Sequence, residues 1–136
     1  MKSPSALGSA PATAVPETPG GALKAFVGAI EQGNVALAAT CVSRDGCLIT
    51  PDATAINGRD AIRAILNQLV KLRLRVEGNS THWVVAGDIA LGRGVWQSRS
   101  EHNGTELAQQ WNATIVLRRR DQAWRIQIIA PWEAAS

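Results

Sequence analysis

The sequence predicts an α+β fold in which about three N-terminal helices wrap a curved antiparallel sheet of four long strands plus a short strand pair. Apolar residues recur at helical spacing between residues 22 and 72. From residue 75 onward the pattern changes to long strand segments that are separated by turn signals. Because these strands follow the helices and do not alternate with them, a parallel doubly wound sheet is excluded.

A single domain is expected over residues 20–136, preceded by a disordered tail over residues 1–19. The tail holds four of the six prolines and few apolar side chains that could offset the entropy of ordering it. The net charge of +3 is mild, and Arg118–Arg120 fall at a strand end, so we expect a solvated turn there and no nucleic-acid partner. No apolar run is long enough for a membrane span, and no apolar segment follows Lys2, which predicts a cytoplasmic protein.

The helices are predicted from apolar spacing and end signals. The first is expected from Ala22 to the Gly33-Asn34 pair, whose residues tolerate a left-handed helix end. A short helix over Val35–Val42 follows, and a third is expected over Ala61–Leu72. The apolar stripes are Leu23, Phe26, Val27 and Ile30 in the first helix, and Ile62, Ile65, Leu66 and Leu69 in the third.

Two short strands are expected between the second and third helices. The segment Cys47–Thr50 is apolar and β-branched, and Pro51 ends it, because proline cannot donate to a strand ladder. Ala55–Ile56 is expected to return beside it. The turn Asn57–Asp60 then leads into the third helix, where the side chain of Asn57 or Asp60 can cap exposed N–H groups.

The register of the long strands is predicted from their turns. Asn103-Gly104 favours a two-residue type I′ hairpin, which pairs His102 with Thr105 and Trp96 with Trp111. A four-residue connection over Arg120–Ala123 then gives the pairs Arg119 with Trp124, Leu117 with Ile126, Ile115 with Ile128, Ala113 with Ala130, and Trp111 with Trp132. A turn at Gly87-Asp88 adds Val85, Trp83, Thr81, Asn79 and Glu77 to the same face.

This shared face predicts a pocket. Its middle carries the small residues Gly94, Ala113 and Ala130, beside a row formed by Trp96, Trp111 and Trp132. Large side chains next to small ones leave space, which indicates an apolar pocket with an aromatic wall. Toward the strand ends the face becomes polar, with Glu77, Asn79, Ser98 and Gln109 expected at the mouth. The alternative is that the tryptophans fill an ordinary core.

The sequence gives no sign of a metal site or a cofactor. Cys41 and Cys47 are the only cysteines, and because neither has metal-ligand spacing or a nearby histidine cluster, reduced thiols are expected. The register places His82 on the face opposite the tryptophans and His102 at the hairpin turn. Two histidines so far apart cannot form a ligand cluster.

Four phrases of the sequence occur in a characteristic order. They are Glu31-Gln32-Gly33-Asn34, Ile49-Thr50-Pro51-Asp52-Ala53, Asn57-Gly58-Arg59-Asp60-Ala61-Ile62-Arg63, and the closing strands Thr114–Arg119 and Trp124–Ile126. Over residues 22–132 their order and spacing resemble the nuclear transport factor two-like superfamily, specifically its SnoaL-like and ketosteroid isomerase-like small bacterial members. The resemblance implies a cone-shaped fold with a helix-lidded hydrophobic pocket, usually in a homodimer.

The resemblance also locates the acid–base groups of the isomerases, and all three are missing here. In the isomerases the general base is an aspartate that precedes a proline, and this chain has Thr50 at that position. Phe26 occupies the position of the isomerases' oxyanion tyrosine, and Ala113 lies near the position of their protonated aspartate. Two other carboxylates are candidate catalytic residues: Glu77, whose pKa an apolar wall could raise, and Asp52, in the loop that borders the pocket. Their structural alternatives are a surface ion pair with an arginine for Glu77 and a turn for Asp52.

We therefore expect a homodimeric domain that binds a small apolar or aromatic ligand. The alternatives are an isomerase, polyketide cyclase or hydrolase that uses Glu77 or Asp52, and a non-catalytic dimerisation module. The residues expected at the ligand are Phe26, Ile30, Asn79, Thr81, Trp83, Gly94, Trp96, Ser98, Gln109, Trp111, Ala113, Ala130 and Trp132. The dimer is expected through the outer sheet face, whose mixed character suits an interface: Leu91, Val95, Thr114, Val116 and Ile129 with Arg93, Gln97, Gln110, Asn112 and Gln127.

Overall fold

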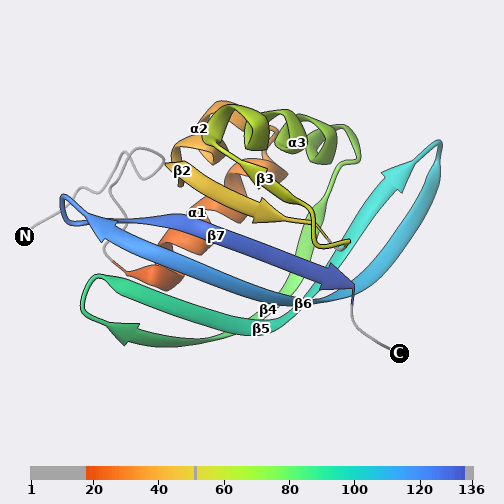
Figure 1. The fold of residues 1–136 in the computed structure, drawn as a ribbon. Coiled ribbons are helices and arrows are strands. Elements are labelled where there is room, and N and C mark those ends of the chain that lie inside the picture. The colour runs from red at the N-terminus through yellow and green to blue at the C-terminus, as the bar shows by residue number, and fades with distance from the viewer. Residues whose placement is uncertain (1–17, 51, 134–136) are drawn as a thin grey trace, which may run out of the picture.

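The computed structural model describes residues 18–50 and 52–133, in which helices cover one face of a curved, open sheet (Figure 1). The predicted α+β class is confirmed. The elements are α1 (Pro19–Glu31), α2 (Val35–Thr40), β2 (Val42–Ile49), β3 (Ala55–Asn57), α3 (Arg59–Lys71), β4 (Arg75–Ala86), β5 (Ile89–His102), β6 (Thr105–Arg120) and β7 (Ala123–Glu133). The strand order is β3-β2-β7-β6-β5-β4. Residues 1–17 of the predicted tail, which was expected over residues 1–19, lie outside the described residues.

Helix α1 begins earlier than the predicted Ala22 because of its cap. Thr18 is the N-cap residue, and its Oγ1 accepts a hydrogen bond from the Gly21 N–H at 3.0 Å. Pro19 occupies the first turn, where its missing N–H costs nothing. Helix α2 ends at Thr40, before the predicted Val42, since Val42 already belongs to strand β2.

Strand β2 makes the sheet mixed, whereas the sequence predicted an antiparallel one. It is longer than the predicted Cys47–Thr50, and it pairs antiparallel with β3 but parallel with β7. The predicted side-chain cap of α3 is absent, because the N-cap is Gly58. Instead, the guanidinium of Arg59 donates from Nε and Nη2 to the Val42 carbonyl at 3.1 and 2.6 Å, which ties the start of α3 to β2.

The predicted pairing of β5 with β6 is confirmed over the whole hairpin, including Trp96 opposite Trp111. Asn103 and Gly104 both have positive φ, as a type I′ turn requires. Strand β4 is also in the predicted register from Val85 to Asn79. A second two-residue turn joins β6 to β7, shorter than the connection we expected.

A β-bulge in β7 overturns part of the predicted register. Leu117 pairs with Ile126 as predicted, but Val116 pairs with Ile128, so that Gln127 is the extra residue. The predicted pairs Ile115 with Ile128, Ala113 with Ala130 and Trp111 with Trp132 are therefore wrong: Ile115 faces Ile129, Ala113 faces Pro131, Thr114 faces Ala130, Asn112 faces Trp132 and Trp111 faces Glu133. The expected row of three tryptophans is reduced to the Trp96–Trp111 pair. Ile129, expected on the outer face, belongs to the inner one.

A second bulge lies in β4, between Val76 and Gly78. Val76 pairs with Ser98 on the inner face, and Glu77 has no partner in the ladder. The prediction that Glu77 shares the face of the tryptophans is therefore wrong. Both bulges shift the strand by one residue, and a shift of one residue moves side chains to the other face.

The core lies between the helices and the centre of the inner sheet face. Its fully buried side chains include Ile62 and Leu66 from α3 and Ile115, Leu117 and Ile126 from the sheet. On the inner face the indole of Trp83 packs against Gly92 and leaves no room for a side chain there. A Cβ at Gly92 would stand 2.5 Å from Cζ3 of Trp83.

Candidate functional site

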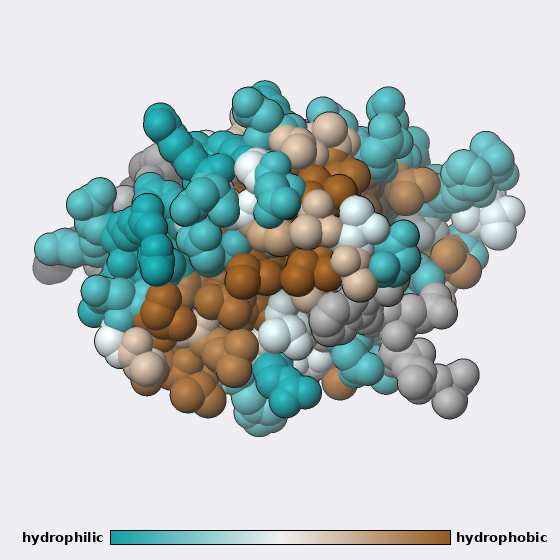
Figure 2. All heavy atoms as spheres, viewed as in Figure 1, coloured by the Kyte–Doolittle hydropathy of each residue, from teal (hydrophilic) through white to brown (hydrophobic). Residues whose placement is uncertain are grey.

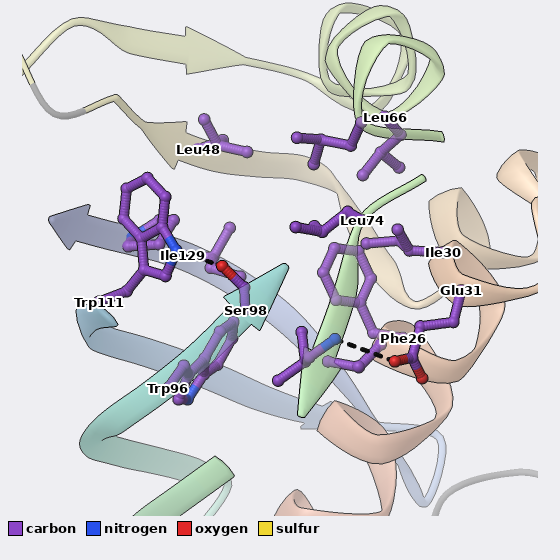
Figure 3. A pocket seen from close by; sticks show the side chains of 14 residues that line it. Phe26, Ile30, Glu31, Leu48, Leu66, Leu74, Trp96, Ser98, Trp111 and Ile129 are labelled. Atoms are coloured by element: carbon purple, nitrogen blue, oxygen red, sulfur yellow. Dashed lines mark hydrogen bonds between the residues drawn. The ribbon is translucent and has the colours of Figure 1, made fainter. Parts of the chain in front are cut away.

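A pocket of about 140 Å³ lies between α1, α3 and the inner face of the sheet (Figure 3). The surface that it presents is almost entirely apolar. Helices α1 and α3 contribute one side, while β2, β4, β5, β6 and β7 contribute the other. Its lining consists of Phe26, Val27, Ile30, Glu31, Leu48, Leu66, Leu69, Leu74, Val76, Trp96, Ser98, Trp111, Ile129 and Pro131.

The aromatic wall is formed by Trp96 and Trp111, which are directly opposite each other on β5 and β6. Trp96 is buried and Trp111 is half-buried. The indole N–H of Trp111 donates to Oγ of Ser98 at 2.7 Å, a diagonal contact across the two strands. The indole N–H of Trp96 donates to Oγ1 of Thr81 at 3.4 Å. Both indoles thus present ring surface to the pocket while their polar atoms are bonded within the protein.

Glu31 is the one ionisable side chain among the described residues that line the pocket. Its Oε2 accepts a hydrogen bond from the backbone N–H of Val76 at 2.9 Å, which connects the end of α1 to the bulge in β4 (Figure 3). The bulge directs Val76, and not Glu77, toward the pocket. The Glu31 carboxylate is therefore hydrogen-bonded to the backbone of β4 at the edge of the apolar pocket.

Glu77, the first catalytic candidate, lies on the outer face. Its Oε1 is 2.8 Å from Nε of Arg99, and about half of each side chain is exposed. Arg99 also contacts Glu106, and these two carboxylates raise the pKa of the Arg99 guanidinium. The structural alternative for Glu77, a solvated carboxylate paired with an arginine, is the arrangement observed.

Asp52, the second catalytic candidate, is exposed in the loop between β2 and β3 and does not line the pocket. Its carboxylate accepts hydrogen bonds from the hydroxyl of Thr50 and the backbone N–H of Thr54. These bonds, first that of the Thr50 side chain, lower the pKa of Asp52 below its usual range. A carboxylate with a lowered pKa is a weaker base, so the geometry suits turn formation.

Five of the predicted ligand residues do line the pocket: Phe26, Ile30, Trp96, Ser98 and Trp111. Six others are described but do not line it, namely Thr81, Trp83, Gly94, Gln109, Ala113 and Ala130. The side chains of Asn79 and Trp132 lie outside the described ones. The other nine lining residues were not predicted, and four of them illustrate two different reasons. The apolar stripe of α3 could have indicated Leu66 and Leu69, whereas Val76 and Ile129 reach the pocket only because of the bulges.

The last candidates are the buried thiol of Cys41, groups of metal-ligating side chains and membrane-spanning helices. Burial raises the pKa of the Cys41 thiol, although Arg125 opposes the effect, so Cys41 stays protonated at neutral pH. Over residues 18–50 and 52–133, no group of three or more His, Cys, Asp or Glu side chains is arranged to hold a metal ion. None of the helices in these two segments combines the length and apolarity needed to cross a membrane.

Comparisons with known proteins agree with this architecture. The family profile described as SnoaL-like domain matches residues 21–129. A search of curated protein sequences gave no match. Among solved structures, an NTF2-like protein with a cystatin-like fold from Novosphingobium aromaticivorans superposes with a TM-score of 0.74 at 16% identity, over 85% of this chain and 79% of that one.

Two further solved structures have the same fold. A candidate dehydratase of the NTF2-like family from Streptomyces avermitilis gives a TM-score of 0.76 at 18% identity, over 86% of this chain and 94% of its own. A candidate calcium/calmodulin-dependent protein kinase II association domain from Xanthomonas campestris gives 0.74 at 19% identity, over 91% and 94%. At these identities the likeness shows the fold and leaves the activity open.

Proposed function

The chain belongs to the SnoaL-like domain family, and we propose that it binds a small, uncharged, apolar ligand between its helices and the Trp96–Trp111 wall. The observation that supports this most directly is a cavity whose surface is almost entirely apolar. Pockets that bind small molecules are typically lined by hydrophobic and aromatic side chains. The fold supplies this lining from seven separate elements.

The size of the cavity suits a ligand of about one ring. An apolar cavity of about 150 Å³ engineered into another protein stays dry and binds benzene, and the cavity here is about 140 Å³. An apolar ring that entered it would exchange water for contact with two indoles and several leucines. An anionic ligand such as benzoate would lose its hydration without gaining an opposite charge, because no described residue of the lining is a cation.

Binding without acid–base catalysis is the function that the pocket chemistry favours. A general base has to reach the proton that it removes. Glu77 is held on the outer face by Arg99, and Asp52 is bonded within its turn. An isomerase, cyclase or hydrolase that depends on either carboxylate is therefore the weaker proposal.

Calorimetric titration with toluene and with benzoate tests this function, since the two probes share a ring and differ in charge. We expect toluene to bind and benzoate to give no heat. Val27→Trp should abolish toluene binding, because Val27 lies on α1 at the pocket wall. Ala25→Trp is the matched control, because Ala25 is exposed on the same helix. Absence of toluene binding to the wild type, or equal binding of benzoate, would reject the proposal.

We also propose that the outer sheet face joins two copies of the chain. Leu91 and Val95 are 37% and 39% exposed there, and Val84 beside them is 66% exposed. Figure 2 shows apolar side chains gathered over the β4–β5 hairpin. Contiguous apolar surface of this kind is typical of interfaces, and symmetric dimers are the commonest oligomer. Because of the bulge in β7, Ile128 lies on the outer face, where Ile129 was predicted.

Light scattering of the purified protein tests the dimer. We expect a dimer for the wild type and a monomer for Leu91→Arg, because the new charge would be buried in the interface. Leu107→Arg is the matched control: Leu107 is equally apolar and 51% exposed, but it shares the inner face at the far hairpin. A wild-type monomer at high protein concentration would overturn the dimer.

A further inference from the structure

The hydroxyl of Ser98 has an unused hydrogen-bond donor at the pocket wall. Ser98 lines the pocket and is only 6% exposed. Its Oγ accepts the indole N–H of Trp111 at 2.7 Å (Figure 3). A serine hydroxyl has one O–H donor and two lone pairs, so this bond occupies one lone pair and leaves the donor unused. Within residues 18–50 and 52–133, the Ser98 hydroxyl donates no hydrogen bond.

The other polar side chains of the lining have no donor to offer. The indole N–H of Trp111 is bonded to Ser98, and that of Trp96 is directed to Oγ1 of Thr81 at 3.4 Å. An ionised Glu31 has only acceptor oxygens, and its Oε2 already takes a backbone N–H of β4. Among the described side chains of the lining, the Ser98 O–H is therefore the donor that remains for a ligand.

We propose that the ligand is an apolar ring compound with one uncharged hydrogen-bond acceptor, such as a carbonyl or ether oxygen, and that this atom accepts from the Ser98 O–H. This inference rests on the proposed function, since it names the chemical class of the ligand in that same pocket. A pure hydrocarbon would cover the hydroxyl and leave its donor unpaired, which costs free energy. A ligand hydroxyl also has lone pairs, so alcohols belong to the same class.

Trp111 positions and polarises Ser98 for this bond. Trp111 lies directly opposite Trp96, and Ser98 lies two residues from Trp96 on the same face. The diagonal bond from the indole N–H therefore holds Oγ at the wall. Hydrogen bonds in a chain strengthen one another, so the bond that Ser98 accepts favours the one that it donates. The chain runs from the Trp111 N–H through the Ser98 hydroxyl to the acceptor of the ligand.

Calorimetric titration of the full chain with benzaldehyde and styrene tests this inference. The two compounds have nearly the same shape, and only benzaldehyde has an acceptor oxygen. The measured quantity is the ratio of their Kd values, because a change in this ratio between two variants cancels the different hydration of the free compounds. Ser98→Ala alone is not sufficient, since it frees the Trp111 N–H to donate to benzaldehyde in its place.

The comparison is therefore made in proteins that carry Trp111→Phe, where Ser98 is the remaining donor. Adding Ser98→Ala should weaken benzaldehyde binding relative to styrene by roughly three- to tenfold, the change made by one neutral hydrogen bond. Ser100→Ala in the same background is the matched control. Ser100 lies two residues further along β5 on the same face and does not line the pocket, so the ratio should stay as it was.

Infrared spectroscopy of bound benzaldehyde tests the same bond in the wild-type protein, even where the variants do not fold. A hydrogen bond to a carbonyl oxygen weakens the C=O bond and lowers its stretching frequency. We expect the frequency of the bound compound to lie below its value in cyclohexane, a solvent without donors. A frequency equal to that in cyclohexane would show that no donor reaches the carbonyl oxygen.

The outcomes distinguish this inference from the proposed function. A loss confined to the protein with Ser98→Ala, together with the lowered frequency, would support both. An unchanged ratio, an equal loss with Ser100→Ala, or styrene binding without benzaldehyde binding would overturn the role of Ser98 and leave the binding of apolar rings intact. Absence of both toluene and styrene binding to the wild type would overturn both.

Discussion

Leu66 should be both a core residue and a wall of the pocket, and Leu66→Ala separates these roles. The side chain is fully buried on α3. Truncating a buried leucine to alanine costs about 2–5 kcal/mol, because contacts are lost and a cavity remains. We expect about 3 kcal/mol here. In a domain of this size each kcal/mol lowers Tm by roughly 4 °C, so Tm should fall by roughly 12 °C.

Ile62→Ala is the matched control, because Ile62 is also fully buried on α3 but does not line the pocket. Both variants should lose similar stability, yet only Leu66→Ala enlarges the pocket. Isopropylbenzene, a larger ring compound than toluene, should therefore bind Leu66→Ala and raise its Tm. At a free concentration of one hundred times Kd the ligand would restore about 2.7 kcal/mol.

Differential scanning calorimetry with and without isopropylbenzene measures this effect. The expected result is a ligand-dependent rise in Tm for Leu66→Ala and little rise for Ile62→Ala. Equal rises in the two variants would mean that the ligand enters a different space. No rise in either variant would mean that truncating Leu66 does not extend a binding pocket, and the reasoning about its wall would be refuted.

Two further predictions concern the sheet and the loop after β2. Gly92→Ala should lower the free energy of unfolding in urea by about 1–3 kcal/mol, because the new Cβ would meet the Trp83 ring at 2.5 Å. In a protein that already carries Trp83→Leu, the same substitution should cost much less. An equal cost in that background would contradict the proposed clash. The pKa of Asp52 is lowered in the folded state, first by its bond from Thr50, so its stabilisation is complete above the unfolded pKa of about 4 and is lost as the pH falls through the lowered value. Asp52→Asn should flatten the dependence of stability on pH below about pH 4 and leave toluene affinity at pH 7 as it was; a loss of affinity would restore Asp52 as a site residue.

The sequence predicted the β5–β6 hairpin completely because its register depends on local chemistry. Asn103-Gly104 can adopt positive φ at both turn positions, and fourteen consecutive pairs follow from that one turn. The same reasoning succeeded for β6–β7 only as far as Leu117 and Ile126. Alternation carries a register along a strand until an extra residue interrupts it.

Neither bulge could be predicted from local sequence because the groups that accompany them are distant. The side-chain nitrogen of Gln127, the extra residue of β7, lies 3.3 and 3.2 Å from the main-chain and side-chain oxygens of Asp45, 82 residues away in sequence. The N–H of Val76, at the bulge in β4, is bonded to Glu31, 45 residues away. A bulge leaves a backbone group without a ladder partner, and in β4 the bond from the Val76 N–H to Glu31 satisfies such a group. In β7 the distant contact is made by the side chain of Gln127.

The two bulges decide the chemistry of the pocket. Strict alternation would have directed Glu77 and Ile128 to the inner face, and the bulges direct Val76 and Ile129 there instead. The first exchange matters more, because it removes a carboxylate from an apolar wall and gives it a cation, Arg99, on the solvent side. A buried carboxylate beside the indoles would have had the raised pKa that a general base needs. The path of β4, held by Glu31, is therefore the physical reason why Val76, and not Glu77, lies among the described residues that line the pocket.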